Sequence, residues 1–135
     1  MTTAFPDTEA LLIGWLSEQM PDVWVTTDLP EELERVLPVL QVVRIGGGKH
    51  QYPWSLGGPL HDNPTCDLDA YGRDREHAAD LIQRACTLLP LLRNNTAGGG
   101  VITDVVENVG PSWRPDFNPR VRRFGATYEF AIRPA

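Results

Sequence analysis

The sequence predicts a single α+β domain, with two helices packed on one face of a mainly antiparallel or mixed sheet of about four to five strands. Three observations support this prediction. Two segments carry apolar residues at helical spacing, several shorter segments are apolar or alternate as strands do, and 135 residues leave no room for a second core. We therefore expect one domain that spans residues 1–135.

The first helix is expected from about Thr8 to Met20, where Pro21 follows and ends it. Asp7 stands at the position from which a side chain can cap the first turn. The apolar residues of this segment share one face of the helix and would form one buried stripe: Leu11, Leu12, Trp15, Leu16 and Met20.

The segment after this helix contains predicted strands and loops. Residues 23–27 are β-branched and aromatic, which is typical of a short strand, whereas the acidic segment 30–38 can form a loop or a short helical turn. Residues 39–45 are almost entirely apolar, as in a central strand that is covered on both faces. Residues 46–63 are rich in glycine and proline and are predicted to form a long loop, and long ordered loops usually serve a function.

Residues 65–71 alternate between apolar and polar side chains, which predicts a strand with one solvent-facing side. Asp67, Asp69 and Tyr71 would share that side. A divalent ion could bridge the two carboxylates, but the sequence offers no further ligands nearby, and we interpret the pair as part of a solvated face.

The second helix is expected from about Arg75 to Leu92, with Asp74 as its cap and Pro90 ending or kinking its last turn. A turn, a strand and a proline-rich connection are predicted to follow, over residues 94–100, 101–109 and 110–120. The last strand has the clearest alternation, and its apolar face would be formed by Phe124, Ala126, Tyr128, Phe130 and Ile132.

The net charge of −6 is unevenly distributed along the chain. Residues 1–34 hold eight acidic and no basic residues, residues 35–110 are nearly balanced, and residues 111–135 hold five arginines against two acidic residues. Such an asymmetry can help a chain to fold. It also suits a head-to-tail contact between copies, in which different faces of two protomers meet.

The composition argues against a membrane or secreted protein. No apolar run approaches the ~20 residues that span a bilayer, and the amino terminus lacks the basic start and apolar core of a signal peptide. We therefore expect no membrane contact and synthesis in the cytoplasm. Cys66 and Cys86 fit reduced, half-buried thiols, although a bridge between them stays open, and the three histidines do not form a zinc-binding pattern.

No motif in the sequence points to catalysis. The string IGGGKH has Val43 at the first glycine of a P-loop and His50 at its Ser or Thr, so we interpret it as a flexible strand exit. His61 and Asp62 could form an acid–base pair, yet no activated Ser or Cys accompanies them. Cys86 lies among apolar residues and is predicted to be core. We expect no cofactor, no metal and no catalytic residue.

The densest positive charge lies in the stretch WRPDFNPRVRRF, residues 113–124, directly before the last strand. Four arginines in an acidic chain argue against nucleic acid binding, which needs a broadly basic surface. Aromatic and arginine side chains together are typical of protein–protein contacts, and the alternative is a solvated loop whose Trp113 packs back on the core. The candidate interface residues are Trp113, Arg114, Asp116, Phe117, Arg120, Arg122 and Arg123, with Lys49, Tyr52 and Trp54 from the predicted loop 46–63.

Four stretches of the chain together resemble one protein family. They are a V-x-V strand at 23–25, LPVLQVVRIGG, PTCDLDAYGRDREHAADLI and VENVGPSWRPDFNPRVRRFGATYEFAIR. With these stretches the chain resembles the tail terminator proteins of long-tailed, siphovirus-type bacteriophages, especially those that infect actinobacteria. The resemblance covers nearly the whole chain, and its most specific part runs from Gly110 to Tyr128.

The resemblance implies a virion structural protein without catalytic residues, which forms a homo-hexameric ring on the last ring of tail-tube subunits. Such a ring ends tube polymerisation and offers the docking surface for the head. The implied partners are further copies of the chain, the major tail tube protein and the head–tail connector protein, and the implied location is the neck, at the top of the tail. DNA would pass through the ring without specific binding, which suits an acidic subunit.

Two alternatives stay open. The first is a head–tail connector or tail completion protein of the same assembly. The second is a small α+β ligand-binding domain or enzyme, with its polar groups supplied by His61, Asp62, Asp67 and Asp69. If the chain is a terminator, the segments 46–63 and 111–123 should lie at ring or tube contacts. The acidic amino-terminal third should then lie near the basic carboxy-terminal loop of a neighbour or near the tube protein.

Overall fold

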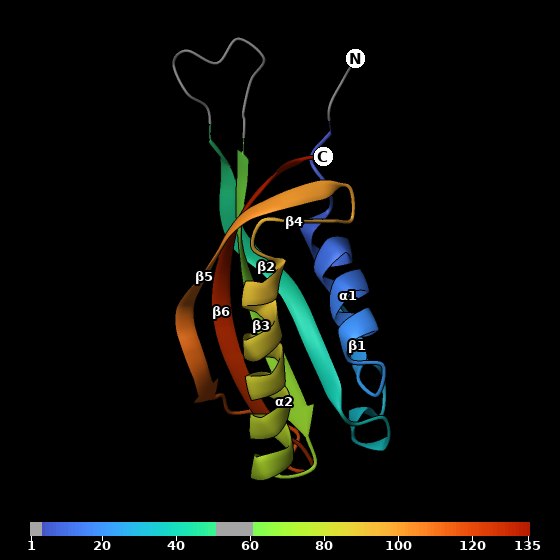
Figure 1. The fold of residues 1–135 in the computed structure, drawn as a ribbon. Coiled ribbons are helices and arrows are strands. Elements are labelled where there is room, and N and C mark those ends of the chain that lie inside the picture. Colours follow the sequence, from blue (N-terminus) through green and yellow to red (C-terminus); the bar gives the residue numbers. More distant parts are fainter. Residues whose placement is uncertain (1–3, 51–60) are drawn as a thin grey trace.

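The structure, a computed structural model, describes residues 4–50 and 61–135 and shows two α-helices on one face of a six-stranded sheet (Figure 1). The α-helices are α1 (Thr8–Gln19) and α2 (Arg75–Leu88), and the short 3₁₀ helices are η1 (Leu33–Arg35) and η2 (Leu89–Leu92). The strands are β1 (Trp24–Thr26), β2 (Val39–His50), β3 (His61–Gly72), β4 (Asn95–Ala97), β5 (Gly100–Trp113) and β6 (Arg122–Pro134). None of the described helices has the length and apolar character of a membrane span.

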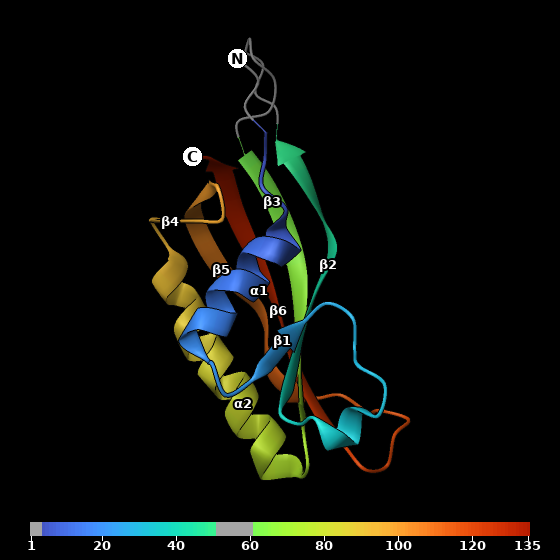
Figure 2. The same ribbon diagram turned by 90° about the vertical axis from the view of Figure 1, so that its right-hand side faces the viewer.

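The sheet has the strand order β1-β2-β3-β6-β5-β4. β1 runs parallel to β2, and the other neighbouring strands are antiparallel. Figure 2 shows both helices on the same side of this sheet. The predicted α+β class is confirmed, with one strand more than the predicted four to five. The additional strand is β4, whose three residues are too few to show an alternation in the sequence.

Both α-helices begin where the sequence predicts, because a capping aspartate precedes each. The Asp7 carboxylate accepts a hydrogen bond of 3.2 Å from the N–H of Ala10, and the Asp74 carboxylate accepts one of 2.8 Å from the N–H of His77. These bonds satisfy amide groups that have no partner inside the first turn. At its other end α2 continues as η2, since Pro90 has no N–H to donate and its ring clashes with α-helical geometry.

The hairpin of β2 and β3 contradicts the predicted loop over 46–63. β2 continues to His50 and β3 begins at His61, and these two residues are paired. Gly47 explains why the glycine-rich segment remains a strand: its φ is 85°, and a Cβ there would lie 1.9 Å from the carbonyl oxygen of Asn63. The missing side chain thus allows the two backbones to approach instead of ending the strand.

β5 is also longer than the predicted strand 101–109. It runs to Trp113, which pairs with Phe124 of β6, so residues 110–113 of the predicted connection belong to the sheet. Three register shifts interrupt the β5–β6 ladder, and Pro111 lies within the last of them. A proline fits there because the ladder does not require its missing N–H at a shift.

The main hydrophobic core lies between the helices and the sheet. The five residues of the last strand that were predicted to share an apolar face are all buried: Phe124, Ala126, Tyr128, Phe130 and Ile132. Four of the five residues in the predicted apolar stripe of the first helix are buried in this core: Leu11, Leu12, Leu16 and Met20. The fifth, Trp15, is half-buried.

A smaller core lies on the opposite face of the sheet and corrects two predictions. It is formed by Leu33, Val39, Tyr71 and Val121. The polar side of residues 65–71 is therefore not solvated, since Tyr71 is buried and Asp69 is only 3% exposed. Residues 39–45 are covered on both faces only at their start, because Ile45 is exposed.

Leu89 and Leu91 offer a matched test of the main core. Leu89 is fully buried, whereas Leu91, two positions further along η2, is 60% exposed. We expect Leu89→Ala to lower the free energy of unfolding by about 2–5 kcal/mol, because it removes packed methyl groups and leaves a cavity. Leu91→Ala should change it by less than about 0.5 kcal/mol. Urea unfolding followed by circular dichroism measures both, and equal effects would contradict the packing of η2.

Alkaline pH tests the burial of Cys66, whose thiol has its pKa raised by desolvation from 9.0 to about 12. The unfolded chain loses this proton at lower pH than the folded protein. The associated stability is therefore fully present below pH 9.0 and is lost as the pH rises towards about 12. We expect the urea concentration at half-unfolding to fall when the pH is raised from neutral to a value between 9.0 and about 12. This fall should be larger for the wild type than for Cys66→Ala. Parallel falls would show that the thiol is accessible.

Candidate docking surface

One face of the described sheet carries no α-helix (Figures 1 and 2). Val106 and Val109 of β5 are exposed on this face, where they lie opposite Glu129 and Thr127 of β6. The centre of the same face holds a cluster of charged side chains from β3, from β6 and from the segment that joins β5 to β6. This face therefore combines apolar and charged groups without a covering layer of helices.

Asp69 of β3 holds a nearly buried carboxylate at the centre of the charged cluster. Arg114 Nη1 donates a hydrogen bond of 3.1 Å to its Oδ1, and Arg123 Nη2 donates one of 3.0 Å to its Oδ2. The hydrogen bond with Asp69 raises the pKa of the Arg123 guanidinium. A buried carboxylate is costly unless charged donors neutralise it, so the two arginines are what allows Asp69 to be buried here.

Arg114 also joins Asp69 to Asp67, its neighbour on the same side of the strand. Its Nη1 lies 3.4 Å from Asp67 Oδ1, its Nη2 donates to Thr127 Oγ1 at 3.1 Å, and Thr127 donates in turn to Asp67. The two carboxylates that the sequence offered as a metal-bridging pair are thus bound by arginine. Among the residues that the structure describes, no group of three or more His, Cys, Asp or Glu side chains could hold a metal ion.

Gly125 of β6 creates the space in which Arg114 lies. It is the register partner of Asp69, and a Cβ at this position would lie 2.4 Å from Asp69 Oδ1 and 2.6 Å from Arg114 Cζ. Such overlap is impossible in a close-packed site. Any larger residue would therefore displace either the carboxylate or the guanidinium.

The docking loop, which we define as residues 113–122, is fastened near both of its ends. Arg114 takes part in the ion pairs described above, and Val121 is buried in the smaller core. Between them the Asp116 carboxylate accepts a hydrogen bond of 3.1 Å from the N–H of Asn118. The loop is therefore held in one shape by contacts within the subunit.

The docking loop presents two aromatic side chains to solvent. Phe117 at its middle is 99% exposed and Trp113 at its start is 61% exposed, so the alternative in which Trp113 packs back on the core is wrong. Pro115 and Pro119 further restrict the backbone on either side of Phe117. Because the loop is already ordered, an aromatic side chain on it loses little conformational entropy when it contacts another surface.

Four exposed arginines gather at the end of the molecule that carries the docking loop, because Gly72, just before α2, pairs with Arg122. They are Arg73, Arg75, Arg120 and Arg122. None of these four forms an ion pair within the described residues. No local pattern in the sequence places Arg73 and Arg75 at this surface, since only the sheet register brings them beside the loop.

The acidic amino-terminal third already meets the docking loop within one chain. Asn118 donates a hydrogen bond of 3.3 Å to Glu34. The pKa of Glu34 is lowered, first by its own backbone hydrogen bond and further by Asn118 and Arg120. Part of the charge asymmetry of the sequence therefore serves the fold of a single subunit.

The predicted interface residues divide into three groups. The exposed members are Trp113, Phe117, Arg120 and Arg122. The members held by contacts within the subunit are Arg114, Asp116 and Arg123. The members whose side chains lie outside the described part are Lys49 of β2, Tyr52 and Trp54.

The groups considered for catalysis have other partners. Arg44 donates two hydrogen bonds of 2.8 Å to the buried Asp62 carboxylate, which is therefore committed to Arg44 and not to His61. Cys86 packs against the main core, and burial raises the pKa of its thiol. A nucleophile or general base needs an accessible and activated group, which neither Asp62 nor Cys86 provides.

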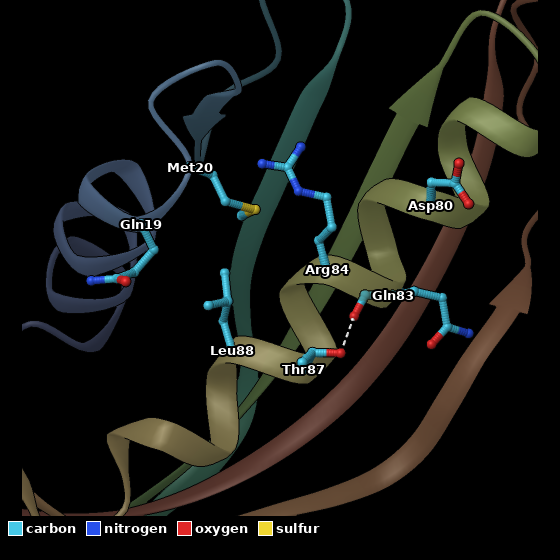
Figure 3. A pocket seen from close by; sticks show the side chains of 7 residues that line it. All are labelled: Gln19, Met20, Asp80, Gln83, Arg84, Thr87 and Leu88. Atoms are coloured by element: carbon cyan, nitrogen blue, oxygen red, sulfur yellow. Dashed lines mark hydrogen bonds between the residues drawn. The ribbon is translucent and has the colours of Figure 1, made fainter.

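A groove of about 640 Å³ lies on the other side of the sheet, between α1 and α2 (Figure 3). Met20, which follows α1, and Leu88 of α2 provide its apolar lining. Asp80, Gln83 and Arg84 stand along its α2 side. The groove is thus an apolar hollow with a charged margin, on a different face from the docking loop.

Substitution of Gly125 tests whether Arg114 fixes the docking loop. We expect Gly125→Ala to lower the free energy of unfolding by about 1–3 kcal/mol, as overpacking does, and to speed tryptic cleavage after Arg120. Gly14→Ala is the control, because Gly14 lies in α1 with no atom within 4 Å of an added Cβ. It should raise stability by about 0.5–1 kcal/mol, since alanine is the better helix former. Unchanged stability and cleavage in Gly125→Ala would show that the loop does not depend on Arg114.

The family model described as phage tail termination protein matches residues 4–135, which is nearly the whole chain. No curated protein is similar enough to give a match. The chain therefore belongs to the phage tail termination protein family, a family of structural components of the virion tail.

Proposed function

We propose that this protein caps the phage tail tube as a ring of six copies, which ends tube polymerisation and provides the surface on which the head docks. The proposed partners are further copies of the chain, the major tail tube protein and the head–tail connector protein. The proposed location is the neck of the virion. Family membership supports this function, and the exposed aromatic and arginine side chains of the docking loop support a role for that loop in the contacts.

The docking loop has the properties of a contact surface between subunits. Interface energy concentrates in aromatic and arginine side chains, and this loop exposes Phe117, Trp113, Arg120 and Arg122 together. The ion pairs of Arg114 and the burial of Val121 hold the loop in place before any partner arrives. An ordered loop of this composition is better suited to docking than to chemistry on a small molecule.

The charge distribution favours contacts between unlike faces of neighbouring copies. The docking loop and the start of α2 expose four arginines and form a basic end, whereas Asp7 and Glu18 are exposed at α1, on the face of the sheet that carries the helices. A contact between two different faces repeats from one copy to the next, and it forms a closed ring when the rotation closes. Opposite charges on these faces guide the approach and disfavour wrong pairings.

The acidic character of the subunit suits a passage for DNA. A net charge of −6 per copy repels the DNA backbone, so the duplex can move through the ring without specific binding. A ring whose inner surface proved to be lined with arginine would contradict this part of the proposal.

Charge reversal at the basic end tests the proposed ring. We expect Arg120→Glu combined with Arg122→Glu to abolish rings at tube ends in electron micrographs, and to yield overlong tails when it replaces the natural gene. The control is Arg133→Glu, which changes an exposed arginine at the far end of β6 and should behave as the wild type. Arg123 is left unchanged, because its guanidinium neutralises Asp69 and its loss would disturb the fold.

Two results would contradict the proposal in different ways. Capping of tubes and normal tail lengths in the double variant would remove the basic end from the interface. Tails of normal length in particles that lack the gene, together with bare tube ends after addition of wild-type protein, would remove the terminator function itself.

A further inference from the structure

We propose that the groove between α1 and α2 receives Phe117 from the docking loop of a neighbouring copy. This inference rests on the proposed ring and names one specific contact within it. Four properties of the molecule support this contact: the composition of the groove, the exposure of Phe117, the charges around both surfaces and the positions of the two surfaces.

The groove offers an apolar floor of adaptable shape. Figure 3 shows Met20 on the α1 side and Leu88 and Thr87 on the α2 side of the hollow. Met20 also belongs to the main core, so the floor of the groove is continuous with the packed interior. Methionine adapts to the shape of a guest and makes favourable contacts with aromatic rings, which makes an aromatic side chain a suitable occupant.

Among the residues that the structure describes, Phe117 is the side chain that best matches such a groove. It is 99% exposed, and no described residue of its own subunit covers it. The flanking prolines and the ion pairs of Arg114 hold it away from the body of the subunit. An exposed aromatic ring on an ordered loop gains most when it enters an apolar hollow.

The charges around the two surfaces are complementary. Arg84 at the groove donates two hydrogen bonds of 3.0 Å to Asp22, so its positive charge is already neutralised. Asp80 forms no ion pair within the described residues and leaves the margin of the groove negative. The guest loop carries Arg120 and Arg122, which are exposed and not paired with an acid in the described part of their own subunit. When Phe117 enters the groove, Arg120 and Arg122, which follow it in the loop, would therefore lie near the negatively charged margin.

The positions of the two surfaces require a second copy. The docking loop lies beside η1 at one end of the sheet, whereas the groove lies between the helices on the opposite face (Figure 2). One subunit therefore carries Phe117 and the groove on different faces. Repetition of such a contact gives a head-to-tail assembly, which is the type that a ring needs.

The sheet edges are less suitable for the same contact. The outer edge of β5 is paired with β4 over residues 100–102, and the rest of β5 contains three register shifts against β6 and Pro111. The outer edge of β2 is paired with β1 over residues 39–41, and the N–H of Arg44 further along donates to Glu9 at 2.8 Å. Bulges, prolines and covered amide groups are features that prevent strands from pairing with another chain. Side-chain docking into the groove is therefore favoured over extension of the sheet.

Cysteine cross-linking tests the contact in rings assembled on tail tubes. The variant carries Pro119→Cys beside Phe117 and Gln83→Cys at the groove, in a background in which Cys86→Ser removes the half-buried thiol. On oxidation we expect a ladder of covalent oligomers that ends at the hexamer. The matched control pairs Pro119→Cys with Val106→Cys, an exposed position of β5 on the face of the sheet that carries no α-helix, and should give no ladder.

Substitution of Phe117 provides the second measurement. We expect Phe117→Ala to weaken binding to tube ends by about tenfold or more, as loss of an interface hot spot does, and Phe117→Leu to retain most of it. Val109→Ala, which shortens another exposed apolar side chain, is the control. Rings that form without cross-linking between Pro119→Cys and Gln83→Cys would overturn the groove contact and leave the proposed ring intact. If the wild type forms no ring on tubes, the contact fails together with the proposed function.

Discussion

The buried carboxylate of Asp69 is the constraint on which the rest of the candidate surface depends. A charge in this position must be neutralised, and the arginines that do so come from 45 and 54 residues further along the chain. Their pairing holds the segment between β5 and β6 against the face of the sheet that carries no α-helix. It also decides which arginines are available for other contacts, because Arg114 and Arg123 are used internally while Arg120 and Arg122 remain exposed.

Two glycines make this architecture possible by allowing close approach. Gly125 leaves room for Arg114 above the sheet, and Gly47 lets β2 pass beside Asn63 at a distance that no side chain could tolerate. In both places the absence of a Cβ allows neighbouring groups to pack closely, whereas glycine is more often found where regular structure ends. The long β2–β3 hairpin and the fixed docking loop are therefore consequences of the same steric property.

The two faces of the sheet serve different purposes in this fold. One face carries the helices, the main core and the groove of Figure 3, whereas the other carries the charged cluster and leads to the docking loop. Phe117 and the groove lie on different faces of the subunit, so one copy can contact the next through two unlike surfaces. This arrangement is consistent with membership of the phage tail termination protein family.

The sequence by itself determined the α+β class, the start of both helices, the change of geometry at Pro90 and the buried face of β6, because capping, proline geometry and alternation act over a few neighbouring residues. The end of the second helix differs from the prediction, since α2 ends at Leu88 and residues 89–92 form η2. It also indicated the family and drew attention to the segment around Phe117. Only the tertiary structure decided that Asp67 and Asp69 are neutralised by arginine, that the segment 46–50 is a strand, and that Arg73 lies beside the docking loop. These features depend on strand register and on contacts between distant segments, which local patterns do not encode.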